Sequence, residues 1–262
     1  MTTLTTRTIT ALRHEYDDLS ARIGSLELDG LTAGSGAADW SVAQVLSHLG
    51  SGAEIILAGL QVALGEREPT DDGFDRAVWA RWDASTPEAQ RDGYLEQTLA
   101  LVTAFEALTP EQHTSVQVTL PYLPAPVSIA TYAGMRLSEA AHHGWDVRIS
   151  TDPGAALLEE TTAVLLDHFA GDLGFLLGFV GRADQVSVPV VLALGNSGYS
   201  IAVTDRVALA ASTDEPTARF SGPSEAAIRL IAGRLGPAHT PSEVTVTGNV
   251  TLDDLRAVFP GF

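Results

Sequence analysis

Apolar residues in the first two thirds of the chain recur at helical spacing. Between residues 5 and 23 they stand three or four positions apart, at Ile9, Leu12, Tyr16, Leu19 and Ile23. This spacing places them on one face of an amphipathic helix. A second helix is predicted after Ser41, because Ser41 and Gln44 stand in the S-x-x-Q arrangement of a capping box. We expect that helix to end near Gly65.

Further helices follow the same pattern. Thr86 and Pro87 begin one that runs to about residue 108, with the expected inward side chains Leu95, Leu99, Val102 and Phe105. Ser128 begins a fourth long helix, IATYAGMRLSEAAHHGWDVRI, and Asp152 and Pro153 precede an apolar helix to about residue 179. The polar segment 66–84 is predicted as a partly helical connection, and the proline-rich segment 116–127 as a loop with a short extended piece. Four long helices joined by uneven loops predict a four-helix bundle with an extra helix.

The pattern changes near residue 180. The segments VSVPVVLAL, YSIAVTD and RVALAAS are short, rich in β-branched residues and separated by turns, as strands are. Ser224 begins a helix, EVTVTG is another predicted strand, and LDDLRAVF is a last short helix. We therefore predict two domains: an all-α four-helix bundle over residues 1–180 and a small α+β domain over residues 181–262.

Charge and composition exclude several classes of function. The chain has 33 Asp and Glu against 15 Lys and Arg, a net charge of −18, which argues against binding to nucleic acid or to an anionic membrane surface. Cysteine is absent, which excludes disulfides, a cysteine nucleophile and cysteine metal sites. The most apolar run, around residues 163–180, is interrupted by Asp167, His168 and Asp172, so no membrane span is expected. The N-terminal residues lack the apolar core of a signal peptide, and we predict a cytoplasmic protein.

Three residues form a candidate metal site. Glu139 and His143 lie four positions apart on a predicted helix, which stacks them on one face. His48 lies on another helix of the predicted bundle, and facing helices of bundles commonly build metal sites. Two imidazoles and a carboxylate form a usual ligand set of catalytic zinc. From spacing alone, a solvated Glu139–His143 pair and a core histidine at position 48 are alternatives.

Two stretches around these residues resemble a known superfamily. DWSVAQVLSHL resembles the W-(T/S)-x-x-x-(V/L)-x-x-H-(L/V) stretch of the DinB-like metalloproteins, and MRLSEAAHHGWDV is similar to their R-x-x-E-x-x-x-H-x-x-D stretch. The predicted layout resembles the mycothiol-dependent maleylpyruvate isomerase family, which joins a DinB-like bundle to an α+β domain related to sterol carrier proteins. The tail SGPSEAAIRLIAGRLG…VTVTGNVTLDDL resembles the end of that second domain.

The resemblance implies roles for particular residues. It implies that zinc is held by His48, Glu139 and His143, with the fourth position left to water or a thiol. It also implies that an arginine of the second domain holds an anionic substrate, with Arg234 as the best match and Arg229 as the alternative. The other interpretation of such an arginine is a solvated side chain that interacts with the dipole at a helix end. The two domains are then expected to form the active cleft together, covered by the segments 66–84 and 116–127.

Three neighbouring residues receive weaker assignments. His142 points about 100° away from His143 on a helix and is expected to be a bystander. Asp146 either supports a ligand imidazole or forms a salt bridge with Arg136 or Arg148. Trp40 is expected to pack.

The activity that the resemblance implies is thiol chemistry. A zinc-dependent enzyme of this family would use mycothiol as its cosubstrate and would isomerise or conjugate a small electrophile, as an isomerase or an S-transferase. The acidic net charge favours a neutral or larger electrophile over a small anion. Two alternatives remain open: a DinB-like metalloenzyme of other chemistry, such as hydrolysis or natural-product tailoring, and a non-enzymatic ligand-binding or regulatory protein with an idle metal site.

Overall fold

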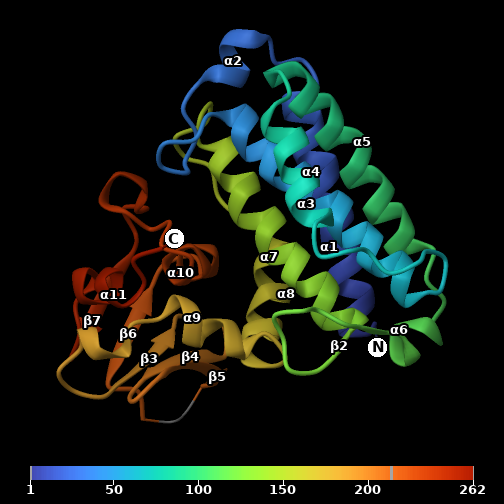
Figure 1. The fold of residues 1–262 in the computed structure, drawn as a ribbon. Helices are drawn as coiled ribbons and strands as arrows, with labels where there is room; N and C mark the ends of the chain where they lie inside the picture. Colours follow the sequence, from blue (N-terminus) through green and yellow to red (C-terminus); the bar gives the residue numbers. More distant parts are fainter. Residues whose placement is uncertain (1, 213–214, 262) are drawn as a thin grey trace. The chain divides into compact units, whose positions relative to one another are not determined.

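The chain folds into two compact units, and the boundary between them in the sequence falls after Asp152. The structure is a computed structural model that describes residues 2–212 and 215–261. The first unit is helical and the second combines helices with a sheet, as predicted (Figure 1). Each unit has its own buried apolar core.

The first unit is a bundle of four long helices. These are α1 (Leu4–Ile23), α3 (Val42–Ala63), α5 (Pro87–Glu106) and α7 (Ile129–Arg148). Helix α3 packs along α5 and α1 packs along α7, and the pairs α1–α5 and α3–α7 close the ring. The predicted four-helix bundle is therefore confirmed.

Side-chain caps fix where these helices begin. Ser41 Oγ accepts a hydrogen bond from the backbone N–H of Gln44, and Gln44 Oε1 accepts one from the N–H of Ser41, so the predicted capping box is present. Thr86 and Ser128 cap α5 and α7 with one hydrogen bond each, which their hydroxyl oxygens accept from the backbone N–H groups of Ala89 and Thr131. Such caps satisfy backbone N–H groups that have no partner within the helix. Gly65, just after α3, adopts a positive φ of 73°, which a glycine takes without strain.

Short elements connect the bundle helices. They are α2 (Leu28–Thr32), α4 (Phe74–Asp83), α6 (Gln112–Ser115) and an antiparallel pair of two-residue strands, β1 (Gln117–Val118) and β2 (Val127–Ser128). The connection 66–84 is thus partly helical and 116–127 is bounded by short extended pieces, as expected. One inward assignment on α5 is wrong: Leu99 is 41% exposed, whereas Thr98 is buried, because the face that α5 turns to the bundle is centred on Tyr94, Thr98 and Leu101.

The second unit contains a five-stranded sheet. Its strand order is β5 (Val207–Ala211), β4 (Tyr199–Val203), β3 (Val190–Leu194), β6 (Ala218–Ser221) and β7 (Thr245–Gly248). Strands β3 and β6 are parallel and the other neighbours are antiparallel. Strand β6 has no counterpart in the sequence prediction. The helices of this unit are α8 (Glu159–Ala170), α9 (Leu177–Val180), α10 (Ser224–Ile231) and α11 (Leu252–Val258), with 3₁₀ turns η1 (Gly174–Leu176), η2 (Ala183–Gln185) and η3 (Pro237–His239).

The segment 153–180 differs from its prediction. The expected single helix is two, since α8 begins at Glu159 and ends before Gly171, and α9 follows after η1. Helix α8 packs against α10 and β5, so the segment belongs to the second unit and the units divide after Asp152 rather than at residue 180. Apolar periodicity shows that a helix has a buried face, but it does not show which domain covers that face.

Helix α3 is long and apolar enough to span a membrane by length and composition alone. Half of its most apolar window is buried within the structure, where the other bundle helices cover it. The bent pair α8 and α9 meets the same criterion only if the two helices are counted as one span. A buried core helix satisfies the same test.

Candidate metal centre

The candidate metal centre lies between α3 and α7, which run antiparallel. His48 on α3 faces Glu139 on α7. Further along the same pair of helices, the hydroxyl of Tyr132 on α7 donates a hydrogen bond to the carbonyl of Ile56 on α3 at 2.9 Å. Residue numbers therefore rise on one helix as they fall on the other. This register brings His48 level with Glu139 and His143.

The three predicted ligands converge on one point. His48 Nε2 lies 2.9 Å from Glu139 Oε2, and His143 Nε2 lies 3.7 Å from the same oxygen. One donor atom from each residue lies within 4.8 Å of the other two. The two imidazole rings meet edge to face, with centroids 4.6 Å apart. Two imidazole nitrogens and one carboxylate oxygen at this spacing suit a zinc ion, whose ligand distances are close to 2 Å.

These side chains are accessible within the first unit. The Glu139 side chain is 51% exposed and that of His48 is 39% exposed, whereas His143 lies deeper. Desolvation raises the pKa of Glu139, but the hydrogen bond from His48 and the charges of His143 and His48 outweigh it and lower the pKa to about 2. Glu139 is therefore an anionic candidate ligand at neutral pH.

Asp146 orients one of the imidazoles. Its side chain is fully buried, and its Oδ2 lies 2.9 Å from Nδ1 of His143. A hydrogen bond from Nδ1–H to this carboxylate leaves the Nε2 lone pair of His143 directed at Glu139 and His48. Of the two roles considered for Asp146, the structure favours support of a ligand imidazole. Arg148 pairs with Glu15 and Asp18 instead.

A close backbone contact holds Asp146 in place. The N–H of Gly36 donates to the carbonyl of Asp146 at 2.7 Å. A Cβ at position 36 would lie 2.9 Å from the Cα of Asp146, so this approach requires a glycine. The loop before α3 thus fixes the partner of a residue on α7.

Trp40 and His142 take the places expected for them. The Trp40 indole packs near-parallel to the ring of His143, at an angle of 21° and a centroid distance of 6.0 Å, and lies 5.4 Å from the ring of His48. It therefore forms a wall of the centre. His142 is buried, with Nδ1 3.4 Å from the hydroxyl of Ser138, and it is not among the three residues whose donor atoms converge.

The arginines of the second unit differ in their surroundings. Arg229 is buried and forms two hydrogen bonds with Glu225, at 2.7 and 2.9 Å, and a third with the carbonyl of His239. These contacts hold its guanidinium in the interior of the second unit. Arg234 follows α10, is partly exposed, and donates to the carbonyl of Ala232.

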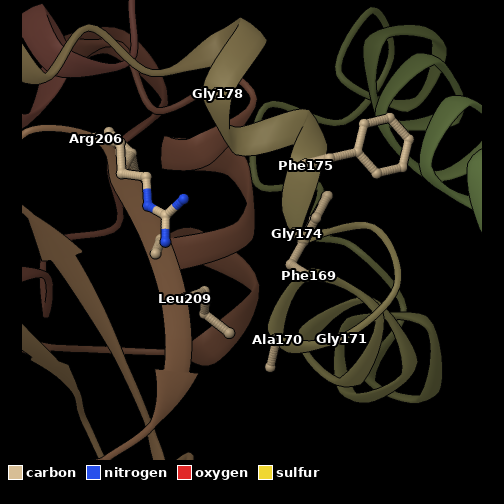
Figure 2. A pocket seen from close by; sticks show the side chains of 10 residues that line it. Phe169, Ala170, Gly171, Gly174, Phe175, Gly178, Arg206 and Leu209 are labelled. Carbon is tan, nitrogen blue, oxygen red and sulfur yellow. The ribbon is translucent and has the colours of Figure 1, made fainter. Parts of the chain in front are cut away.

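A pocket of about 330 Å³ also lies within the second unit. Figure 2 shows Leu209 on strand β5 and Arg206, which directly precedes that strand, along one side, and Phe169, Gly171 and Gly174 on the helical segment along the other. Arg206 is the charged residue among those that line it. No pattern in the sequence predicts this pocket, because its walls come from segments about thirty residues apart whose contact depends on the tertiary fold.

Residues 12–148, which hold α3, α7 and all three converging donors, match the family described as Mycothiol maleylpyruvate isomerase N-terminal domain. The chain belongs to this family. Two solved structures are similar over the full length of both chains: a mycothiol-dependent maleylpyruvate isomerase, with 20% identity and a TM-score of 0.65, and a histidine-to-alanine mutant described by the same name, with 19% identity and a TM-score of 0.66. No curated protein matches the chain by sequence.

These comparisons confirm the suspected family and the fold. The family match over residues 12–148 includes most of the helical bundle. The structural similarity extends to its α+β unit. At about 20% identity this similarity concerns architecture, so the chemistry has to be argued from the residues of the site.

Proposed function

We propose that this protein is a zinc-dependent enzyme that uses mycothiol as its cosubstrate thiol to isomerise or conjugate a small electrophile. The observation that carries the proposal is the convergence of His48, Glu139 and His143 within the family-defining bundle. The ligand set and the low pKa of Glu139 fit a divalent cation.

The residues of the chain would hold the metal and one face of its surroundings. His48, Glu139 and His143 would ligate it, Asp146 would fix the tautomer of His143, and Trp40 would wall the centre. Bound zinc would lower the pKa of a coordinated thiol and so supply a thiolate at neutral pH. The chain has no cysteine, so the sulfur must come from a small molecule. Mycothiol is the thiol for which the family is described.

The reaction would begin with addition of the thiolate sulfur to a conjugated cis double bond. A carbon–sulfur bond forms, the π electrons move into the conjugated carbonyl, and the former double bond becomes a single bond that rotates. Expulsion of the thiolate then restores the double bond in the trans geometry and regenerates the thiolate. If the adduct is protonated on carbon instead, the product is a stable thioether, as in an S-transferase.

Arg234 is the residue we propose for holding a carboxylate of the substrate. A guanidinium binds a carboxylate through two parallel hydrogen bonds. Arg229 already donates two hydrogen bonds to the carboxylate of Glu225. Replacing Arg234 with Met should raise the KM for an anionic electrophile about tenfold and leave the KM for a neutral one unchanged; equal effects on both would assign Arg234 another role.

Metal content tests the proposal first. Elemental mass spectrometry of the purified protein should find close to one zinc per chain in the wild type and in His142→Ala, the control beside the site. His48→Ala and His143→Ala should each lose it. The zinc-loaded wild type should then turn over maleylpyruvate, or conjugate a neutral enone, only when mycothiol is added. Absence of metal from all samples after zinc is supplied, or turnover without thiol, would contradict the proposal.

A further inference from the structure

Arg136 lies one layer beneath the candidate metal centre, inside the bundle. It precedes Glu139 by three residues on α7 and is 2% exposed. Across the antiparallel pair of helices, His48 faces Glu139, and one turn along α3 Gly52 faces Arg136. The Nη1 atom of Arg136 is 3.4 Å from the position that a Cβ on Gly52 would occupy. One helical turn therefore separates the guanidinium from the level of the ligands.

The guanidinium lacks the partners that other buried arginines of this chain have. Among the residues that the structure describes, no group hydrogen-bonds to Nε or Nη2 of Arg136 and no carboxylate lies within salt-bridge distance. Arg148 and Arg229 are as deeply buried, and both are paired with carboxylates. A buried charge without a partner destabilises a fold. Its presence here therefore calls for a reason other than stability.

The surroundings of Arg136 do not cancel its charge. Tyr94 on α5 contributes a phenol whose pKa burial raises, so it stays neutral at physiological pH. Burial lowers the pKa of the Arg136 guanidinium, yet arginine remains protonated near neutrality. The anionic group that acts on Arg136 is Glu139, one of the proposed ligands. The positive charge of Arg136 thus lies near the centre without a direct ion pair, in a region of low dielectric constant where charges act strongly.

We propose that Arg136 is an internal positive charge that raises the affinity of the metal centre for an anionic ligand, of the class of a thiolate or a carboxylate. This inference rests on the proposed metal-dependent function. The charge would attract an anion at the centre and repel the metal cation itself. Removal of the charge should therefore change the two affinities in opposite directions, which loss of a structural contact would not do.

The test uses full-length protein loaded with Co²⁺, with azide as the anionic probe followed by visible absorption. In Arg136→Met the Kd for azide should rise about tenfold, the order of magnitude expected when one unit charge about one helical turn from the centre is removed. The Kd for the metal, measured by competition with a chelator, should stay the same or fall. Arg136→Lys, which keeps the charge, should bind azide within about threefold of the wild type. Arg219→Met, which removes an exposed arginine of the second unit, is the matched control and should change neither value.

Stability gives a readout that needs no metal. The thermal midpoint of metal-free Arg136→Met should equal or exceed that of the wild type, because the variant removes an unpaired buried charge. A lower midpoint, weaker metal binding, or an azide Kd within twofold of the wild type in Arg136→Met would each overturn the inference. If the wild type takes up neither Zn²⁺ nor Co²⁺, the proposed function fails. An unchanged azide Kd in a variant that holds metal overturns the role of Arg136 alone.

Discussion

At the scale of single residues, the candidate centre depends on groups that do not themselves contribute donor atoms to it. The buried carboxylate of Asp146 determines which nitrogen of His143 carries the proton. Gly36 allows the backbone before α3 to approach Asp146. The candidate ligand His143 is therefore oriented by a carboxylate on its own helix, and a hydrogen bond from outside the two helices of the site holds the backbone of that residue; proteins commonly orient metal-binding histidines through such partners.

Replacement of Asp146 with Asn tests this support. The amide keeps the size of the carboxylate but can no longer attract the His143 Nδ1 proton as an anion, so zinc affinity should fall about 10- to 100-fold. A chelator competition assay measures the loss. Asp92→Asn, which removes an exposed carboxylate on α5, should leave the affinity unchanged. Zinc affinity within twofold of the wild type in Asp146→Asn would show that His143 is oriented by packing alone.

At the scale of elements, a buried aromatic side chain anchors α4 to the bundle. Trp82 is buried against Gly50 on α3 and Gly93 on α5. Its Nε1 donates to Glu54 at 2.9 Å, and Arg81 pairs with the same carboxylate. Desolvation raises the pKa of Glu54, but the hydrogen bonds from Arg81 and Trp82 outweigh it and lower the pKa. Two glycines on neighbouring helices thus make room for the ring.

Gly50→Ala should displace α4. A Cβ at position 50 would clash with the Trp82 ring, and we expect a loss of about 2 kcal/mol in the free energy of unfolding, as for other overpacked cores. Denaturant unfolding followed by tryptophan fluorescence measures it. Gly52→Ala is the control on the same helix: its Cβ would meet only the end of the flexible Arg136 side chain, so alanine should be neutral or slightly stabilising. Equal destabilisation of both variants would show that the packing of Trp82 against Gly50 does not explain the loss of stability.

At the scale of the whole molecule, the proposed chemistry is divided between two units. All three candidate ligands, together with Asp146, Trp40 and Arg136, lie in the first unit. The proposed anion-holding Arg234 and the pocket beside Arg206 lie in the second. Metal binding and substrate turnover should therefore be separable.

A fragment of residues 1–152 should fold and bind one zinc with nearly the affinity of the full chain, because its helices bury their apolar faces against one another. It should show no mycothiol-dependent turnover. Circular dichroism, elemental analysis and an activity assay measure these three properties, with His48→Ala in the same fragment as the control. A helical fragment that binds no zinc would show that the second unit completes the metal site.

Local signals in the sequence predicted the elements of the bundle closely. Apolar spacing and caps such as Ser41 with Gln44 gave the long helices to within a few residues, because these depend on interactions between neighbours in the chain. These local signals failed where contacts between distant segments determine the structure. Strand β6 forms by pairing with β3 and β7, the exposure of Leu99 depends on how α5 is rotated, and α8 joins the unit whose sheet covers it.

The candidate site divides in the same way. The sequence by itself determined the ligand types and the i, i+4 spacing of Glu139 and His143, because helix geometry is local. Only the tertiary structure decided that His48 meets them, since that depends on the register of two antiparallel helices. Tertiary structure also decided that Asp146 contacts His143, that Arg229 is committed to Glu225, and that Arg136 is buried without a carboxylate partner in the described chain. The partner of a charged side chain is set by what folding brings within a few ångströms of it, and neither composition nor spacing contains that information.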